Sequence, residues 1–439
     1  MEKLNKASGV DDLECISETL DLFSKPYLDT SLDYYYYQEI NPTSALSETS
    51  NTIQFLVPIS DDYTDLKDSY IKLKLKLKTH DNKKLGAQTA ASSYSIVNQP
   101  ISSVFSSVNI KLNGHLISDS YACYNYLAFI QSLFSYNGDS RGTITRLLGF
   151  DEDDDPTQVQ AHDDAVHSSF KTRAEWVTGS NSATFIGPVF HEFMHQGRAL
   201  IPHVEMSFEF VKAPASFVVI SNLATCNYQY EIEELKMFVK RMKILPSVKL
   251  DLEAKLEKEP ARYPLTQSSV KPYFIDENQV SASFENVFGG RNIPSFCAVM
   301  FLPQDAFRGH YNKAPYLFEN HSLSQLKISF NGMTFPSAGG FQPKYTSTTA
   351  PDWTREYLSL FENTFKKNSG IGISYDEFKS AYAIYCFDFG RNPGHSTDHV
   401  NAKKSASARL DISFETGTKN PALVCLIYSE CDQEIQITG

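Results

Sequence analysis

The sequence predicts an all-β fold made of two tandem eight-stranded jelly rolls (a double jelly-roll) with a few flanking helices. Two observations lead to this prediction. Apolar residues recur at every second position in many short segments, which is the period of a half-buried strand. The predicted strands and helices also come twice in the same order, which indicates that one β unit is duplicated within the chain.

The clearest strand covers residues 71–78, where Ile71, Leu73, Leu75 and Leu77 alternate with lysines. The same alternation occurs in residues 108–112, 204–210, 326–330 and 410–414. Short alternating strands separated by turn residues favour antiparallel sheets that are packed on one face and solvated on the other. A sandwich of such sheets is therefore expected.

Helical periodicity is rarer, and it occurs in three segments. In residues 119–137 the apolar positions are Tyr126, Phe129, Ile130, Leu133 and Phe134, and in residues 352–368 they are Tyr357, Leu358, Phe361 and Phe365. The third segment, residues 247–259, has only a thin stripe of Val248, Leu252 and Leu256 between Pro246 and Pro260. We expect the first two helices to pack on the core and the third to act as a connector.

The duplication is visible as paired landmarks. A strand that ends in Asn-Gly precedes the first helix (residues 108–114) and the second (residues 326–332), and the helices align at a constant offset of 231. Each helix is followed by a Ser-Phe-Glu strand (residues 207–209 and 413–415) and a last apolar strand (residues 235–239 and 424–428). The alternative, that unrelated alternating strands look alike by default, stays open at this point.

These landmarks divide the chain into four parts. We expect an N-terminal arm at 1–20, a first jelly roll with long loops at 21–245, a connecting helix at 246–260 and a second jelly roll at 261–439. Halves of this length suit an eight-stranded jelly roll with decorated loops better than a seven-stranded immunoglobulin-like sandwich.

The composition excludes several classes of protein. The chain has 40 Lys and Arg against 52 Asp and Glu, a formal charge of −12, which does not suit a DNA-coating surface. With 41% hydrophobic residues it is globular, yet its apolar runs fall far short of the roughly 18 residues of a spanning helix. No secretory signal is evident, and seven cysteines without a CxxC pair indicate free thiols in a reducing compartment. Cys297 and Cys425, inside apolar strands, are expected to be buried.

One string matches a catalytic motif. The segment from His191 to His195 reads H-E-F-M-H and fits H-E-x-x-H, in which two His one helical turn apart hold zinc and Glu192 polarises its water. Pro188 and Gly197 leave too few residues for the helix that this motif requires, and a third ligand would have to be His203 or a distant Glu. We therefore predict a loop that leads into a strand at residues 201–202, with zinc peptidase as an alternative.

An acidic segment imitates a calcium loop. Asp151, Asp153 and Asp155 have the right spacing, but Pro156 stands where the loop needs Gly and His162 where it needs Glu. An exposed acidic loop is the better prediction, and a weak cation site is the alternative.

A basic cluster at the end of the first half consists of Lys236, Lys240, Arg241 and Lys243. We interpret it as a solvated face, with a phosphate contact as the less favoured alternative. The chain lacks the elbow and glycine-rich loop motifs of hydrolases and nucleotide-binding proteins. No catalytic, cofactor-binding or metal-binding residue is predicted, and the protein is expected not to be an enzyme.

Several segments resemble one family. They are E-K-E-P-A-R-Y-P-L-T-Q-S-S-V-K from Glu257, Asn286-Val287-Phe288-Gly289-Gly290, Ile293-Pro294, Asp305-Ala306-Phe307, Asn331-Gly332, residues 355–361, Gly372-Ile373-Ser374 and residues 383–389, with Asp21-Leu22-Phe23, residues 104–114 and residues 190–220 upstream. This pattern covers nearly the whole chain and resembles the capsid-like proteins of Polinton (Maverick) elements and adintoviruses.

The resemblance implies a double jelly-roll major capsid protein, in which a homotrimer forms a pseudo-hexameric tile of an icosahedral shell around double-stranded DNA. It implies as partners the neighbouring capsomers and a penton or minor capsid protein, and as location the virion, which is assembled inside the host cell. A jelly-roll glycan or receptor binder and a minor, penton-type capsid protein are the alternatives, because the fold alone does not determine function.

Overall fold

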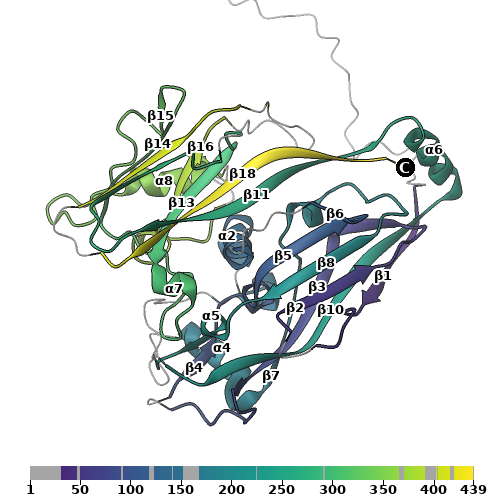
Figure 1. Cartoon of the computed structure of the whole chain (residues 1–439), viewed down its shortest axis with the longest axis horizontal. Coiled ribbons are helices and arrows are strands. Elements are labelled where there is room, and N and C mark those ends of the chain that lie inside the picture. The colour runs from purple at the N-terminus through teal and green to yellow at the C-terminus, as the bar shows by residue number, and fades with distance from the viewer. Residues whose placement is uncertain are drawn as a thin grey trace, which may run out of the picture.

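The computed structural model describes residues 31–46, 50–89, 92–117, 123–140, 142–151, 168–223, 225–289, 292–364, 370–390, 402, 404–415 and 420–438. Within them the chain forms four four-stranded sheets, and all pairs of strands in these sheets are antiparallel. Figure 1 shows the sheets of the first half and those of the second half as two bodies that lie next to each other.

The first half contains a complete jelly roll. One sheet has the order β1 (Leu32–Ile40), β10 (Tyr228–Ile244), β3 (Tyr63–Thr79) and β7 (Ser182–Gly187). The other has the order β2 (Thr52–Val57), β8 (Met206–Lys212), β5 (Phe105–Leu112) and β6 (His115–Leu116). A short pair, β4 (Tyr94–Ile96) with β9 (Val219–Ser221), lies in the connecting segments.

The second half repeats this order strand for strand. One sheet is β11 (Ala261–Ile275), β18 (Leu423–Ile437), β13 (Phe296–Pro303) and β16 (Tyr385–Asp388), and the other is β12 (Ser281–Glu285), β17 (Arg409–Phe414), β14 (Leu323–Phe330) and β15 (Met333–Phe335). In each half, the first strand pairs with the last and the second with the last but one among the eight sandwich strands. The predicted fold class, two tandem jelly rolls, is therefore confirmed.

The two Asn-Gly landmarks form equivalent hairpin turns. Asn113 and Gly114 connect β5 to β6, and Asn331 and Gly332 connect β14 to β15. All four residues have positive φ, at 46°, 79°, 50° and 75° in that order. Two successive left-handed residues are what a tight hairpin turn requires, and Asn-Gly adopts them at the lowest cost. The sequence repeat thus reflects a repeated element of structure.

The helices lie between the strands. They are α1 (Pro100–Ser103), α2 (Tyr124–Ser135), α3 (Ile144–Leu147), α4 (Ser168–Val177), α5 (Ala215–Val218), α6 (Pro246–Leu256), α7 (Gln304–Arg308), α8 (Thr354–Glu362) and α9 (Tyr375–Ser380). Short 3-10 helices are η1 (Gly138–Ser140), η3 (Thr178–Ser180) and η4 (Glu192–His195). No helix in the described part of the chain is long and apolar enough to cross a membrane.

The predicted helices all form, but one of them faces differently from the prediction. α2 buries Tyr126, Phe129, Ile130 and Leu133, as expected. In α8, Leu358 is exposed and Glu356 is buried, so the prediction was wrong for Leu358, whereas Tyr357 and Phe361 pack against the core as expected. The backbone N–H of Gln342 donates to the Glu356 carboxylate (3.0 Å), which provides a partner for a buried acid. Phe365 lies outside the described residues.

Each sandwich buries the alternating residues that the sequence indicates. Leu73, Leu75 and Leu77 of β3 are fully buried, whereas the intervening lysines lie on the outer face with their ammonium groups next to glutamates of β10. Cys297 and Cys425 are buried in the second sandwich, also as expected, and burial raises the pKa of both thiols. The predicted strand at residues 201–202 is absent, since β8 begins at Met206.

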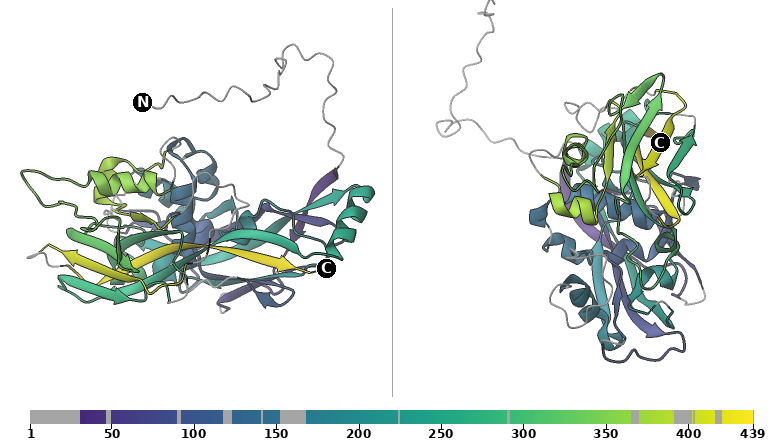
Figure 2. Two further views of the ribbon diagram at one scale, coloured as in Figure 1. Left: turned by 90° about the horizontal axis from the view of Figure 1, so that it is seen from above. Right: turned by 90° about the vertical axis from the view of Figure 1, so that its left-hand side faces the viewer.

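The two jelly rolls share an aromatic contact that is centred on α2. The ring of Phe129 stacks on Tyr316 of the second half with centroids 4.0 Å apart, and Tyr126 stacks on Phe307 at 5.5 Å. The Tyr316 hydroxyl lies 2.6 Å from the hydroxyl of Ser103. Figures 1 and 2 show α2 between the two bodies, with β11 and β18 extending across to α6 at the far end of the first jelly roll.

Candidate functional site

The segment that matches the zinc motif lies in the joint between the two jelly rolls. η4 begins at Glu192, and His191 caps it by accepting a hydrogen bond from the N–H of Phe193 at Nδ1 (3.1 Å). A four-residue 3-10 helix does not set two histidines on one face of an α-helix as the zinc motif requires. Burial lowers the pKa of His191 to about 4 and also lowers that of His195. Both imidazoles are therefore neutral at pH 7.

Glu192 connects three elements. Its carboxylate accepts a hydrogen bond from the Gln131 amide of α2 (2.9 Å) and one from the hydroxyl of Ser268 in β11. Burial is the main influence on this carboxyl and raises its pKa. The carboxylate therefore links the two jelly rolls, since Gln131 belongs to the first half and Ser268 to the second.

The possible third zinc ligand lies in different surroundings. His203 is well exposed, and its Nε2 is 3.6 Å from the Asp61 carboxylate. Among the described residues, no group of three or more His, Cys, Asp or Glu side chains could hold a metal ion together. The segment from His191 to His195 thus packs in the joint and forms hydrogen bonds there.

Asp151, the first residue of the acidic segment, is tied to the body of the protein. Its carboxylate pairs with Arg146 (3.1 Å), and its carbonyl accepts hydrogen bonds from Asn98 (2.7 Å) and Arg173 (3.2 Å). Asp153, Asp155, Pro156 and His162 lie outside the described residues.

Two lysines of the basic cluster form ion pairs within the molecule. Lys236 pairs with Glu39 (2.6 Å), and Lys240 pairs with Asp65 (3.0 Å) and Asp68 (2.5 Å). The prediction of a solvated face is wrong for Arg241, which is only 2% exposed. Its guanidinium donates to Gln38, Thr64 and the carbonyl of Pro58.

A surface that the sequence prediction missed lies on β1. We call it the tyrosine edge and define it as Tyr34, Tyr35, Tyr36 and Tyr37, which are between 40% and 58% exposed. β1 pairs with β10 on one side, and its other side has no strand partner among the described residues. Because side chains alternate between the faces of a strand, the four rings lie on both faces. The available signal was the run itself, since four successive tyrosines cannot all point into one core.

The tyrosine edge is ordered by its neighbours. The Lys240 ammonium lies 4.7 Å from the ring centroid of Tyr35, and that of Lys243 lies 5.3 Å from Tyr34. The Tyr36 hydroxyl donates to Asp62 (3.0 Å), and the Tyr37 ring packs 5.5 Å from Tyr70. Rings that are held in place before binding lose little freedom when a partner arrives.

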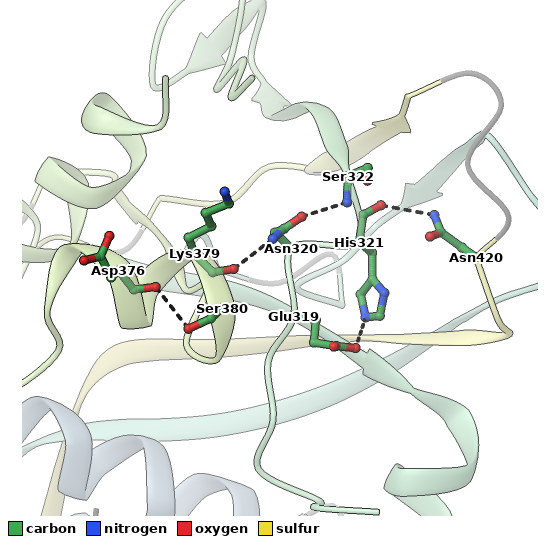
Figure 3. Close-up of a pocket in the computed structure, with 8 residues that line it drawn as sticks. All are labelled: Glu319, Asn320, His321, Ser322, Asp376, Lys379, Ser380 and Asn420. Atoms are coloured by element: carbon green, nitrogen blue, oxygen red, sulfur yellow. Dashed lines mark hydrogen bonds and ion pairs between the residues drawn. The ribbon is translucent and has the colours of Figure 1, made fainter. Parts of the chain in front are cut away.

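A polar pocket of about 500 Å³ lies in the loops of the second jelly roll (Figure 3). It is lined by Glu319, Asn320, His321, Ser322, Asp376, Lys379, Ser380 and Asn420. Asn320 donates to the carbonyl of Lys379 (2.8 Å) and Asn420 to that of His321 (3.2 Å), so these contacts join α9 and two loops. Burial lowers the pKa of His321 to about 4 and raises that of Glu319, whose carboxylate is 3.8 Å from the imidazole.

The strand order of both halves defines the protein as a double jelly-roll. No protein-family model matches the chain. Uncharacterized protein F54H12.2 of Caenorhabditis elegans is 19% identical over 388 residues, which are 85% of this chain and 88% of that protein.

Solved structures of viral proteins share the fold. A chain of the Sputnik virophage cryo-EM structure has a TM-score of 0.65 at 12% identity and covers 99% of this chain and 93% of its own. The Faustovirus major capsid protein has a TM-score of 0.60 at 10% identity, covering 95% and 92% of the two chains, and the mavirus major capsid protein 0.51 at 11%, covering 99% and 97%. At these identities the likeness shows the fold.

Proposed function

We propose that this chain is the major capsid protein of a virus or element of the Polinton (Maverick) or adintovirus type. The observation that carries the proposal is that two jelly rolls of identical strand order stand side by side in one chain. The structural likeness to the Faustovirus and mavirus major capsid proteins over more than nine tenths of each chain supports it.

The proposed function depends on the shape of the assembly that several copies of the chain form. Three copies of a two-sandwich chain that meet head to tail around a threefold axis present six sandwiches, which approximate a hexagonal tile. Such tiles pack against neighbouring capsomers and leave the fivefold positions to a penton or minor capsid protein. The rings of Phe129 and Tyr316 keep the two sandwiches of each chain in a fixed relation, which the tile requires.

The remaining features of the proposal follow from this role. The protein resides in the virion, is assembled inside the host cell, and encloses double-stranded DNA without reading its sequence, since a net charge of −12 disfavours close contact. Its parts are an arm at 1–20, jelly rolls at 21–245 and 261–439, and a connector at 246–260. It performs no catalysis and needs no cofactor or metal.

A glycan or receptor binder is the second candidate function, and the polar pocket is the observation that favours it. Amide, hydroxyl and carboxylate side chains from α9 and two loops line it (Figure 3), and such groups are suited to hydrogen-bond a hydroxyl-rich ligand. Under this function, glycan-array binding is expected without any self-assembly.

Sedimentation of the purified full-length protein tests the proposal. Over a series of rising concentrations we expect a species of three times the 49.4 kDa chain mass, followed by larger assemblies. A protein that remains monomeric at the highest concentrations contradicts the capsid function. Glycan binding by such a monomer supports the second candidate.

A further inference from the structure

We infer that the tyrosine edge of β1 is the docking site for the N-terminal segment, residues 1–30, of a neighbouring copy of this chain. The inference rests on the proposed function, because it requires several copies to assemble. Residues 1–30 lie outside the described residues, and they enter β1 through Ser31.

The shape of the edge favours an extended segment over a flat protein face. The outer row of N–H and C=O groups of β1 faces no strand in the described part of the chain, and an added strand satisfies such groups. Tyr34 and Tyr36 lie on one face of β1, and Tyr35 and Tyr37 on the other. A strand laid along the edge contacts rings on both faces with its alternate side chains, whereas a flat surface reaches one face only.

An uncovered edge of this kind is a liability. Natural proteins protect edge strands with lysine, proline or a covering segment, because exposed aromatic edges otherwise pair with each other indiscriminately. β1 contains neither lysine nor proline between Leu32 and Ile40. The rings are nonetheless held in place by Lys240, Lys243 and Asp62, as expected of a surface prepared for one partner.

The N-terminal segment has the length and chemistry to cover this edge. It precedes Ser31, and thirty extended residues reach about 100 Å. The segment carries seven acidic residues and three lysines, and the ammonium group of Lys243 lies beside the Tyr34 ring of the edge, whereas that of Lys240 is already paired with Asp65 and Asp68. Leu20 and Leu22 flank Asp21 in the alternation of a strand, and Phe23 follows.

The segment comes from a neighbouring copy because folding back onto its own β1 requires a tight hairpin. The carbonyl of Ser31 accepts a hydrogen bond from the N–H of Leu245 (3.2 Å), which fixes the point at which the chain enters β1. The preceding residues, Leu28, Asp29 and Thr30, include neither the Gly nor the Asn that two-residue hairpin turns favour. A segment from another copy needs no turn.

Photo-cross-linking on the full-length chain tests the inference. The photoreactive residue p-benzoylphenylalanine replaces Tyr35, and the matched control replaces Ile186, an exposed residue of β7 at the opposite edge of the same sheet. Isotopically heavy and light protein are mixed before assembly, and cross-linked peptides are identified by mass spectrometry. We expect cross-links from position 35 to residues 1–30, and we expect them to join heavy to light chains as often as random mixing of the copies allows. From position 186 we expect no cross-links to residues 1–30.

Four outcomes overturn the inference. Cross-links to residues 1–30 that never join heavy to light chains place the segment on its own β1. Cross-links from position 35 to residues 31–439 of another copy show that the edge contacts the folded part of that copy. Equal cross-linking to residues 1–30 from position 186 shows that the N-terminal segment has no preference for the tyrosine edge. If sedimentation shows the trimer but the expected cross-links are missing, this inference fails alone, whereas a persistent monomer ends the proposed function as well.

Discussion

At the scale of single residues, the joint between the jelly rolls depends on a buried carboxyl. Glu192 accepts hydrogen bonds from Gln131 and Ser268, and removing a buried acceptor leaves donors unpaired at a cost of about 1–3 kcal/mol. We expect Glu192→Ala to lower the free energy of unfolding by about this amount and Glu192→Gln, which keeps an acceptor, to change it much less. Urea denaturation measures both. Equal losses in the two variants would show that the hydrogen bonds contribute nothing specific.

The same segment gives a prediction about metal. Because η4 is too short to place two histidines as zinc ligands, purified protein is expected to contain far less than one zinc per chain, and a chelator is expected to leave its melting temperature unchanged. Elemental analysis and differential scanning fluorimetry provide the readouts. Stoichiometric zinc that disappears in the His195→Ala variant would restore the peptidase hypothesis.

Two residue-level outcomes show what periodicity could and could not reveal. Arg241 lies two residues beyond Val239 in the inward row of β10, so its position already indicated burial, although its charge suggested exposure. Glu356 became buried because the Gln342 N–H supplies it with a donor, and no local pattern in the sequence announces a partner 14 residues away.

At the scale of elements, the outer face of β3 and β10 carries a ladder of ion pairs. Lys72 pairs with Glu234 (3.1 Å), Lys74 with Glu233 (3.3 Å) and Lys76 with Glu231 (3.3 Å). These ion pairs hold the two long central strands, β3 and β10, in one register. Alternating lysines were readable in the sequence, but their partners come from a strand about 160 residues away, which only the topology brings opposite.

Glu233 gives this ladder a pH dependence. The hydroxyl of Ser182, followed by Lys76 and Lys74, lowers the pKa of Glu233 from its ordinary 4.5 to about 2. A carboxyl whose pKa is lower in the folded state stabilises the fold above pH 4.5 and loses that contribution as the pH falls towards 2. We expect Glu233→Gln to reduce the slope of stability between these pH values. Urea midpoints measured across the range test this.

The control is Glu257→Gln, at the exposed residue that directly follows α6. It is expected to leave the slope close to that of the unchanged protein. Identical slopes for the Glu233 variant and the unchanged protein would contradict the assignment.

At the scale of the whole molecule, the chain contains two copies of the same jelly-roll architecture, and stacked aromatic side chains hold the two copies together. The repeat of strands, Asn-Gly turns and helices could be predicted from the sequence, because each landmark has its own local pattern. The contact of Phe129 with Tyr316 could not, because Tyr316 lies in a loop without periodicity and the helical period of α2 indicates that Phe129 is buried but not what it contacts. The tyrosine edge escaped prediction for a related reason, since its exposure depends on where the sheet ends.

Tyr316 tests whether the two jelly rolls act as one unit. Removing its ring in Tyr316→Ala is expected to cost about 3–5 kcal/mol and to separate calorimetric unfolding into two transitions, one for each sandwich. Tyr316→Phe keeps the ring and loses only the hydroxyl, with its contacts to Ser103 and to the carbonyl of Asn125, so it should cost about 0.5–1.5 kcal/mol and retain a single transition. If the Ala variant also unfolds in one transition at the original temperature, the rings do not couple the halves.

The central claim is that a chain with two equivalent sandwiches assembles in threes to imitate a hexagon. Electron microscopy of the purified full-length protein tests it most directly. We expect class averages with threefold symmetry and six lobes, together with sheets or closed shells built from them. Averages that contain only isolated two-lobed particles at every concentration would contradict it.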